Sequence, residues 1–170
     1  MRISYLLITL GVVARLIPHP WNFTPVGALG LFAGANCNPR VAWLVPLFAL
    51  LVGDLILGLY SPVMMIFVYL GFLAAPVIGR LMIAGRQSVP RIGSAVVVST
   101  SVFFVISNFG VWLGPYYPLT LSALVECYVK AIPFYGATLV GDALYATILF
   151  GGHHVILSAW RRRATLLARS

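Results

Sequence analysis

Acidic side chains are almost absent from this 170-residue chain. Asp54, Glu126 and Asp142 are the only three, against eleven lysines and arginines, and charged residues make up 8% of the sequence. A soluble domain of this length needs a charged shell to stay dispersed, which this composition does not supply. With 61% hydrophobic residues and a mean hydropathy of +1.01, the chain is expected to be a single-domain, all-α integral membrane protein.

Sequence signatures of catalysis and of cofactor binding are also missing. The chain has no HExxH, P-loop or dinucleotide motif, and no serine or cysteine with a plausible base and acid. Cys37 and Cys127 lack metal-site spacing and are expected on opposite sides of the membrane, which argues against a disulfide. The adjacent His153 and His154 would point in different directions on a helix. We therefore predict that the protein is not an enzyme and holds no cofactor or metal.

The net charge of +8 does not indicate nucleic-acid binding. The bases stand singly or in short groups at the ends of apolar runs, not in a stripe interleaved with aromatic residues. Trp160 followed by three arginines is typical of an anchor at the membrane interface. We therefore expect the lipid bilayer, with its anionic headgroups, to be the partner of these bases.

Turn residues divide the chain into apolar runs, and a helix needs about 20 such residues to cross a bilayer. The sequence predicts a bundle of six transmembrane helices at residues 3–17, 24–35, 41–60, 63–84, 92–113 and 133–160. Residues 119–130 are predicted to form a separate short helix at the interface. Alternatively, the short run at 24–35 dips into the membrane and returns, which leaves five spans.

The bases predict the orientation of the bundle. With six spans, the cytoplasmic side would hold Arg2, Arg40, Arg80, Arg86, Arg91, Arg161, Arg162, Arg163 and Arg169, and the outside only Arg15 and Lys130. With five spans, Arg2 and Arg15 exchange sides and the bias is the same, so the C-terminus is cytoplasmic in both cases. An N-terminal signal peptide that ends at Val12-Val13-Ala14 is a further alternative.

Small residues recur at four-residue spacing in two of the runs. Gly30 and Gly34 form one pair, and Gly71, Ala75 and Gly79 form a second stripe. Such stripes let helices approach closely, either within the chain or against a partner subunit.

The sequence also contains an internal echo. The tetrapeptide LVGD occurs at 51–54 and at 139–142, and Asn22-Phe23 recurs as Asn108-Phe109. In the six-span arrangement, the echo relates helices that run in opposite directions, so the sequence suggests a 3+3 inverted pseudo-repeat.

Placing an ionisable side chain inside a bilayer costs about 2.5 to 3.5 kcal/mol of insertion free energy, so each acid in an apolar run is expected to have a structural or functional role. Counted along their helices, Asp54 and Asp142 lie at depths that differ by only about 4 Å, in the outer half of the membrane. They could share a site for a cationic ligand, or they could pair with Arg15 or Lys130 and only join helices. Glu126 and Lys130 are also spaced for a local ion pair.

Several uncharged polar and aromatic residues are expected near the same outer end. Asn108 lies inside an apolar run, where its amide must bind either a ligand or a neighbouring helix. The candidate substrate-binding residues are Arg15, Asn22, Asp54, Asn108, Trp112 and Asp142. In this hypothesis the acids supply charge, the asparagines supply directional hydrogen bonds, and Trp112 supplies a stacking surface.

Two stretches carry a family resemblance, RLIPHPWNFTPV at 15–26 and SNFGVW at 107–112. Shorter blocks at 117–118, 126–128, 131–134 and 138–142 extend it over nearly the whole chain. The chain resembles uncharacterised bacterial membrane proteins described as transport proteins akin to the substrate-binding (S) components of energy-coupling factor (ECF) vitamin transporters. The resemblance implies an S-component-like fold with an outward-facing pocket in the bacterial cytoplasmic membrane. It also implies docking to a transmembrane coupling subunit with two ATPases.

The leading functional hypothesis is a membrane-embedded solute-binding subunit for uptake of a small, cationic or aromatic nutrient. Because the chain has no nucleotide-binding motif, partner subunits or an ion gradient would have to supply the energy. The alternative is a structural or accessory subunit of a larger membrane complex with no ligand of its own, whose small-residue stripes would be its functional surface.

Overall fold

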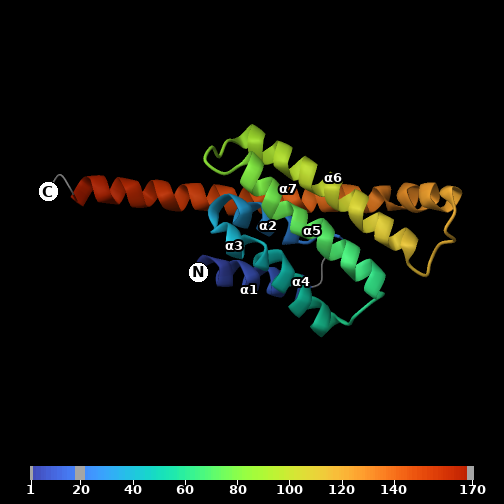
Figure 1. Cartoon of the computed structure of the whole chain (residues 1–170). Helices are drawn as coiled ribbons and strands as arrows, with labels where there is room; N and C mark the ends of the chain where they lie inside the picture. Colours follow the sequence, from blue (N-terminus) through green and yellow to red (C-terminus); the bar gives the residue numbers. More distant parts are fainter. Residues whose placement is uncertain (1, 18–21, 168–170) are drawn as a thin grey trace.

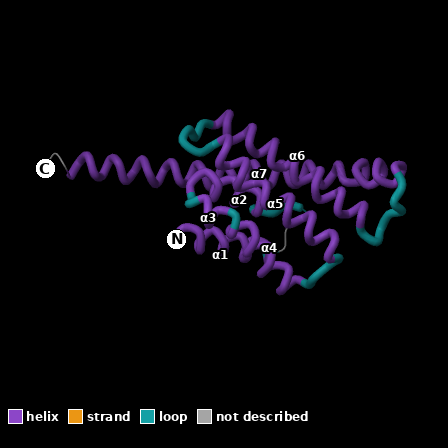
Figure 2. Tube along the Cα trace, in the orientation of Figure 1, coloured by secondary structure: helices purple, strands orange, loops and turns teal. Residues whose placement is uncertain are grey.

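Seven helices make up the described part of the chain in the computed structural model, which describes residues 2–17 and 22–167 (Figure 1). No strand occurs among these residues, which confirms the predicted all-α class (Figure 2). The helices are α1 (Arg2–Leu16), α2 (Val26–Asn36), α3 (Pro39–Ala42), α4 (Leu44–Leu57), α5 (Pro62–Met82), α6 (Val89–Leu113) and α7 (Leu121–Leu167).

Within the described residues, four helical segments are long and apolar enough to cross a membrane. They are Pro39–Leu57, Pro62–Met82, Val89–Leu113 and Leu121–Ala164. The predicted first and second spans correspond to α1 and α2, which are apolar but too short to meet the same length requirement. The structure therefore supports a multi-pass membrane protein of several apolar helices.

The six longer helices alternate in direction along the chain (Figure 1). Arg15 near the end of α1 pairs with Asp54 near the end of α4, so these two helices are parallel. Phe32 of α2 contacts Phe150 of α7, and Ala28 bonds to Asp142, so α2 and α7 are also parallel. Helices α1, α4 and α6 run one way, and α2, α5 and α7 run the other.

The bundle therefore has two chemically different ends. We call the end at which α2 and α5 finish the basic end, because it carries Arg40, Arg80, Arg86 and Arg91 and is the end from which α7 projects with Arg161, Arg162 and Arg163. The opposite end is formed by the last turns of α1, α4 and α6 and the first turns of α2, α5 and α7.

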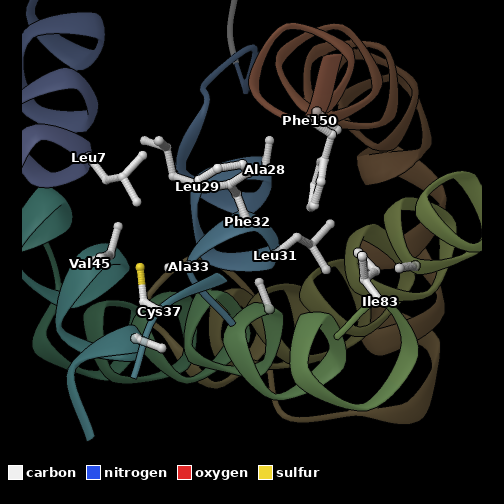
Figure 3. Close-up of a cluster of buried hydrophobic side chains, with 14 of the residues drawn as sticks. Leu7, Ala28, Leu29, Leu31, Phe32, Ala33, Cys37, Val45, Ile83 and Phe150 are labelled. Atoms are coloured by element: carbon white, nitrogen blue, oxygen red, sulfur yellow. The ribbon is translucent and has the colours of Figure 1, made fainter. Parts of the chain in front are cut away.

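Helix α2 is the centre of the bundle and packs against all six other helices. Nine of its eleven residues, from Val26 to Gly34, are buried. Leu29, Leu31 and Phe32 are the largest side chains that it contributes to the main hydrophobic core (Figure 3). A helix too short to span a bilayer has backbone ends at membrane depth, and these are tolerated because protein surrounds them.

The small-residue stripes of α2 and α5 pack against each other. A Cβ atom on Gly34 would collide with the carbonyl oxygen of Pro76, and one on Gly79 would collide with that of Leu31. Gly30 faces Ala75 across the same contact. The stripes therefore serve packing within the chain, as one of the two alternatives predicted.

Helix α7 corrects the expected separation of residues 119–130 from a sixth span at 133–160. A single helix of 47 residues covers both, with Pro133 inside it. Pro133 is exposed, on the side of α7 away from the buried Ala131 and Thr138, so its ring leaves the packed face of the helix intact. At 1.5 Å per residue α7 is about 70 Å long, and its C-terminal part extends well beyond the bundle (Figure 1).

Candidate functional site

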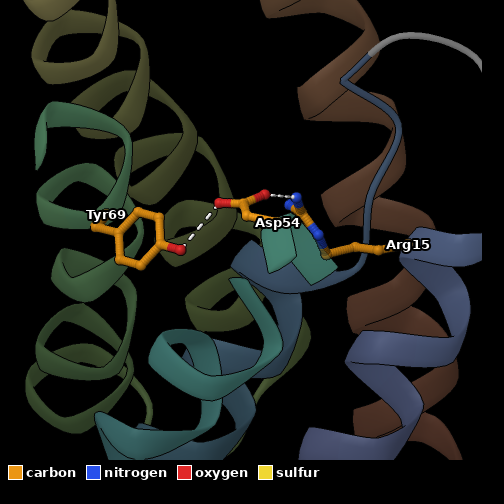
Figure 4. Close-up of polar contacts among 3 residues, drawn as sticks. All are labelled: Arg15, Asp54 and Tyr69. Atoms are coloured by element: carbon orange, nitrogen blue, oxygen red, sulfur yellow. Dashed lines mark hydrogen bonds and ion pairs between the residues drawn. The ribbon is translucent and has the colours of Figure 1, made fainter. Parts of the chain in front are cut away.

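Asp54 is buried near the end of α4, where it joins three helices. Arg15 of α1 donates to its Oδ1, and the hydroxyl of Tyr69 of α5 donates to its Oδ2 at 2.9 Å (Figure 4). A side chain at Gly53 would collide with the Arg15 guanidinium, so glycine leaves room for the arginine. Both oxygens of Asp54 have protein partners, which is the structural alternative predicted for this acid.

The loop between α4 and α5 adds a tyrosine to the surroundings of Asp54. Burial, and then the negative charge of Asp54, raise the pKa of Tyr60 to about 12, while Arg15 opposes this shift. The Tyr60 hydroxyl is therefore protonated throughout the physiological range.

Asp142 is equally buried, but its partners are different. The backbone amide of Ala28 donates to its Oδ1 at 3.0 Å, and the Thr100 hydroxyl donates to its Oδ2 at 3.1 Å. The first turn of α2 has no cap from the side chain of its N-cap residue, Pro25, so Asp142 supplies the acceptor from α7. The absence of a side chain at Gly27 makes room for the carboxylate. Asp142 thus stabilises the buried N-terminus of α2.

The two acids do not meet in one polar site. Among the described residues, they have no hydrogen-bond partner in common, and neither lines the cavity described next. The expectation that they hold a ligand together finds no support in this geometry. Similar depth along two helices does not make two side chains face each other.

A cavity of about 420 Å³ lies between α5, α6 and α7, toward the end of the bundle opposite the basic end. This volume falls within the range of small-molecule sites. Its walls are Asn22, Met64, Val68, Thr100, Phe103, Phe104, Ser107, Asn108, Val111, Tyr117, Cys127, Lys130, Ala131, Phe134, Tyr135 and Thr138. Aromatic rings and a few convergent polar groups are the usual lining of such a site.

The cavity is built from one face of each of two antiparallel helices. On α6 the lining residues recur every three or four positions from Thr100 to Val111, and on α7 they do so from Cys127 to Thr138. The Tyr128 hydroxyl donates to the Val105 carbonyl at 2.6 Å and helps to join the two helices. The cavity therefore runs lengthwise, from the two threonines toward the loops.

The predicted site residues fall into three groups. Asn22 and Asn108 line the cavity, as the hypothesis of ligand contact requires. Arg15 and Asp54 pair with each other, and Asp142 caps α2. The ring of Trp112 lies outside the lining, tilted by 47° against Phe109 at a centroid distance of 5.4 Å, and its buried indole N–H has no hydrogen-bond partner among the described residues.

The two asparagines differ in their local structure. Asn108 donates its side-chain amide to the Phe104 carbonyl at 2.8 Å, which leaves its amide oxygen for a ligand. Asn22 adopts a left-handed φ of 60°, a conformation that asparagine tolerates better than most residues.

Sequence reasoning missed most of the cavity wall. Phe103, Phe104, Phe134, Tyr135 and Thr138 resemble ordinary apolar or interfacial residues when each is considered alone. Their recurrence every three or four positions on two adjacent helices was the available signal. The ion pair of Lys130 with Glu126 was predicted and is present.

The described residues contain no group of three side chains suited to hold a metal ion. Cys37 and Cys127 are buried free thiols.

Comparison with known proteins gives one match. The model of DUF6580, a family of unknown function, matches residues 1–165. No curated protein and no solved structure matches the chain.

Proposed function

The chain belongs to DUF6580, and since no function is known for that family, we propose from the geometry that it is a membrane-embedded solute-binding subunit for uptake of a small nutrient. The observation that carries the proposal is the aromatic and polar cavity at the end of the bundle opposite the basic end. Because arginine-rich segments remain in the cytoplasm, that cavity would open to the outside, where a nutrient arrives. Asn22 and Asn108 would bind the ligand directly.

We further propose six membrane-crossing segments in the S-component-like arrangement, with the C-terminus in the cytoplasm. The alternating directions of α1, α2, α4, α5, α6 and α7 support this count. The two LVGD segments lie on α4 and α7, which run in opposite directions, as a 3+3 inverted repeat requires. A coupling subunit and ATPases in the cytoplasmic membrane would then supply energy.

The alternative of an accessory subunit without a ligand depended on the small-residue stripes as a docking surface. Gly30, Gly34 and Gly79 are used inside the chain, between α2 and α5. That leaves the cavity as the better-supported functional feature.

The test is ligand-dependent thermal stabilisation of the purified full chain against a panel of vitamins and metal ions. We expect at least one vitamin to raise the melting temperature of the wild type, and Asn108→Leu to reduce that shift. Thr147→Val is the matched control, because Thr147 is exposed on α7 and does not line the cavity.

The variant Asp54→Asn distinguishes ligand binding in the cavity from ligand binding by the two buried acids. It is expected to lower the melting temperature without ligand but to keep the ligand-induced shift. If no compound stabilises the wild type, or if Asn108→Leu responds as fully as Thr147→Val, the proposal is wrong. If Asp54→Asn alone abolishes the shift, the ligand is bound by the acids and not in the cavity.

A further inference from the structure

The charged residues around the cavity indicate the sign of the charge that a ligand would carry. Among the described residues that line the cavity, Lys130 is the only one that carries a charge at neutral pH, and none is a carboxylate. Lys130 bonds to Glu126, which is not part of the lining, and the ammonium group has further donors to offer. The mouth of the cavity therefore favours an anionic group, in contrast to the cationic ligand that the two acids suggested.

The middle of the cavity is aromatic. The rings of Phe104 and Tyr135 meet edge-to-face with their centroids 5.3 Å apart, and the ring centroids of Phe103 and Phe72 are 4.1 Å apart. Rings from α6 and from α7, including Phe134, thus face the same space from both sides. Such walls favour a flat aromatic ring, which gains offset or edge-to-face contacts as well as burial.

The deep end presents an acceptor, the hydroxyl of Thr138. Thr138 donates a hydrogen bond to the Phe134 carbonyl at 2.9 Å, so the remaining lone pairs of its hydroxyl oxygen can only accept. Thr100, beside it, donates to Asp142 and is fully buried. A ligand that reaches the Thr138 hydroxyl would be held best through an O–H or N–H group of its own.

The spacing of the two ends sets the ligand's length. Lys130 and Thr138 are eight residues apart on α7, a rise of about 12 Å. A single ring is too short to reach both, whereas a two-ring system with substituents at its two ends is long enough.

We propose that the cavity binds a two-ring aromatic carboxylate with a hydroxyl or amino donor at its far end, the carboxylate at Lys130 and the donor at Thr138. This assignment rests on the proposed function, because it names the ligand class of the same site.

The probes are 6-hydroxy-2-naphthoate, its neutral carboxamide, 2-naphthoate without the hydroxyl, and decanoate. Binding is measured by titration calorimetry on the full chain in detergent. The hydroxynaphthoate is expected to bind about fivefold more tightly than either the carboxamide or 2-naphthoate, because each of these lacks one polar contact. Decanoate, which has the carboxylate but no rings, is expected to bind more weakly than all three.

Two variants test which end of the cavity binds which end of the ligand. Lys130→Met should weaken the hydroxynaphthoate about fivefold and leave the carboxamide unchanged. Thr138→Val keeps the side-chain shape and should weaken the hydroxynaphthoate but not 2-naphthoate. Thr147→Val should change neither.

The outcomes separate this inference from the proposed function. If the carboxamide binds as tightly as the carboxylate, or decanoate binds as tightly as the aromatic acids, the ligand class is wrong. The same holds if the naphthalene compounds do not bind while a vitamin still stabilises the wild type through Asn108, and the proposed function then stands. If neither the vitamins nor these probes bind, both fail.

Discussion

At the residue scale, Asp142 shows how a single buried acid can hold two helices. Its carboxylate accepts from the Ala28 amide at the start of α2 and from the Thr100 hydroxyl of α6. Without it, the amide would be buried with no partner, a cost of about 1 to 3 kcal/mol. The need of the Ala28 backbone amide for an acceptor therefore explains why an acid is buried at this position of a membrane helix.

We expect Asp142→Ala to lower the free energy of unfolding by about 1 to 3 kcal/mol, because the Ala28 amide loses its acceptor. Asp142→Asn retains one acceptor oxygen and should cost less. The measurement is SDS- or urea-induced unfolding in detergent, followed by circular dichroism, with the exposed Thr147→Val as control. Equal stability of Asp142→Ala and the wild type would show that the cap contributes nothing.

Residue-scale prediction from the sequence succeeded only where both partners have recognisable side chains. The pairs Arg15–Asp54 and Glu126–Lys130 could be anticipated, because opposite charges and helical spacing are visible in the sequence. The partner of Asp142 could not, because every residue has a backbone amide and only the fold shows which one is left without a carbonyl.

At the element scale, hydropathy predicted most helix positions to within a few residues. Its failure at Pro133 has a physical cause. A proline interrupts one hydrogen bond and one face of a helix, and here that face is exposed, so α7 continues. The length of α2 was also visible in the sequence, but not its place at the centre of the bundle, which depends on the contacts of six other helices.

The contact between α2 and α5 predicts a strong contrast between two glycines. Gly34→Ala would push a methyl group into the Pro76 backbone and should lower the free energy of unfolding by about 1 to 3 kcal/mol. Gly136→Ala, on α7, meets no atom of the described residues within 4 Å and should stabilise its helix by about 0.5 to 1 kcal/mol. Detergent unfolding of the two variants side by side measures the difference. Similar effects from both would mean that the helices do not approach this closely.

At the scale of the whole molecule, the cavity combines segments that lie far apart in the sequence. Asn22, Met64, Asn108 and Lys130 come from four different parts of the chain, and no local pattern relates them. What the sequence could predict was the general location, since Asn22 and Asn108 were both expected near the outer end of the bundle. The facing aromatic walls required the antiparallel pairing of α6 with α7, which is a tertiary fact.

The position of the cavity at the end opposite the basic end makes membrane orientation the property on which the uptake proposal depends. Val89 and Leu119 are both highly exposed; Val89 begins α6 at the basic end, and Leu119 lies in the loop between α6 and α7 at the cavity end. In a background with Cys37→Ala and Cys127→Ala, Val89→Cys and Leu119→Cys each provide one reactive thiol. A membrane-impermeant maleimide should label Leu119→Cys in intact cells, and Val89→Cys only after permeabilisation, because bases are retained on the cytoplasmic side. The reverse pattern would turn the cavity toward the cytoplasm, where it could not receive a nutrient from outside.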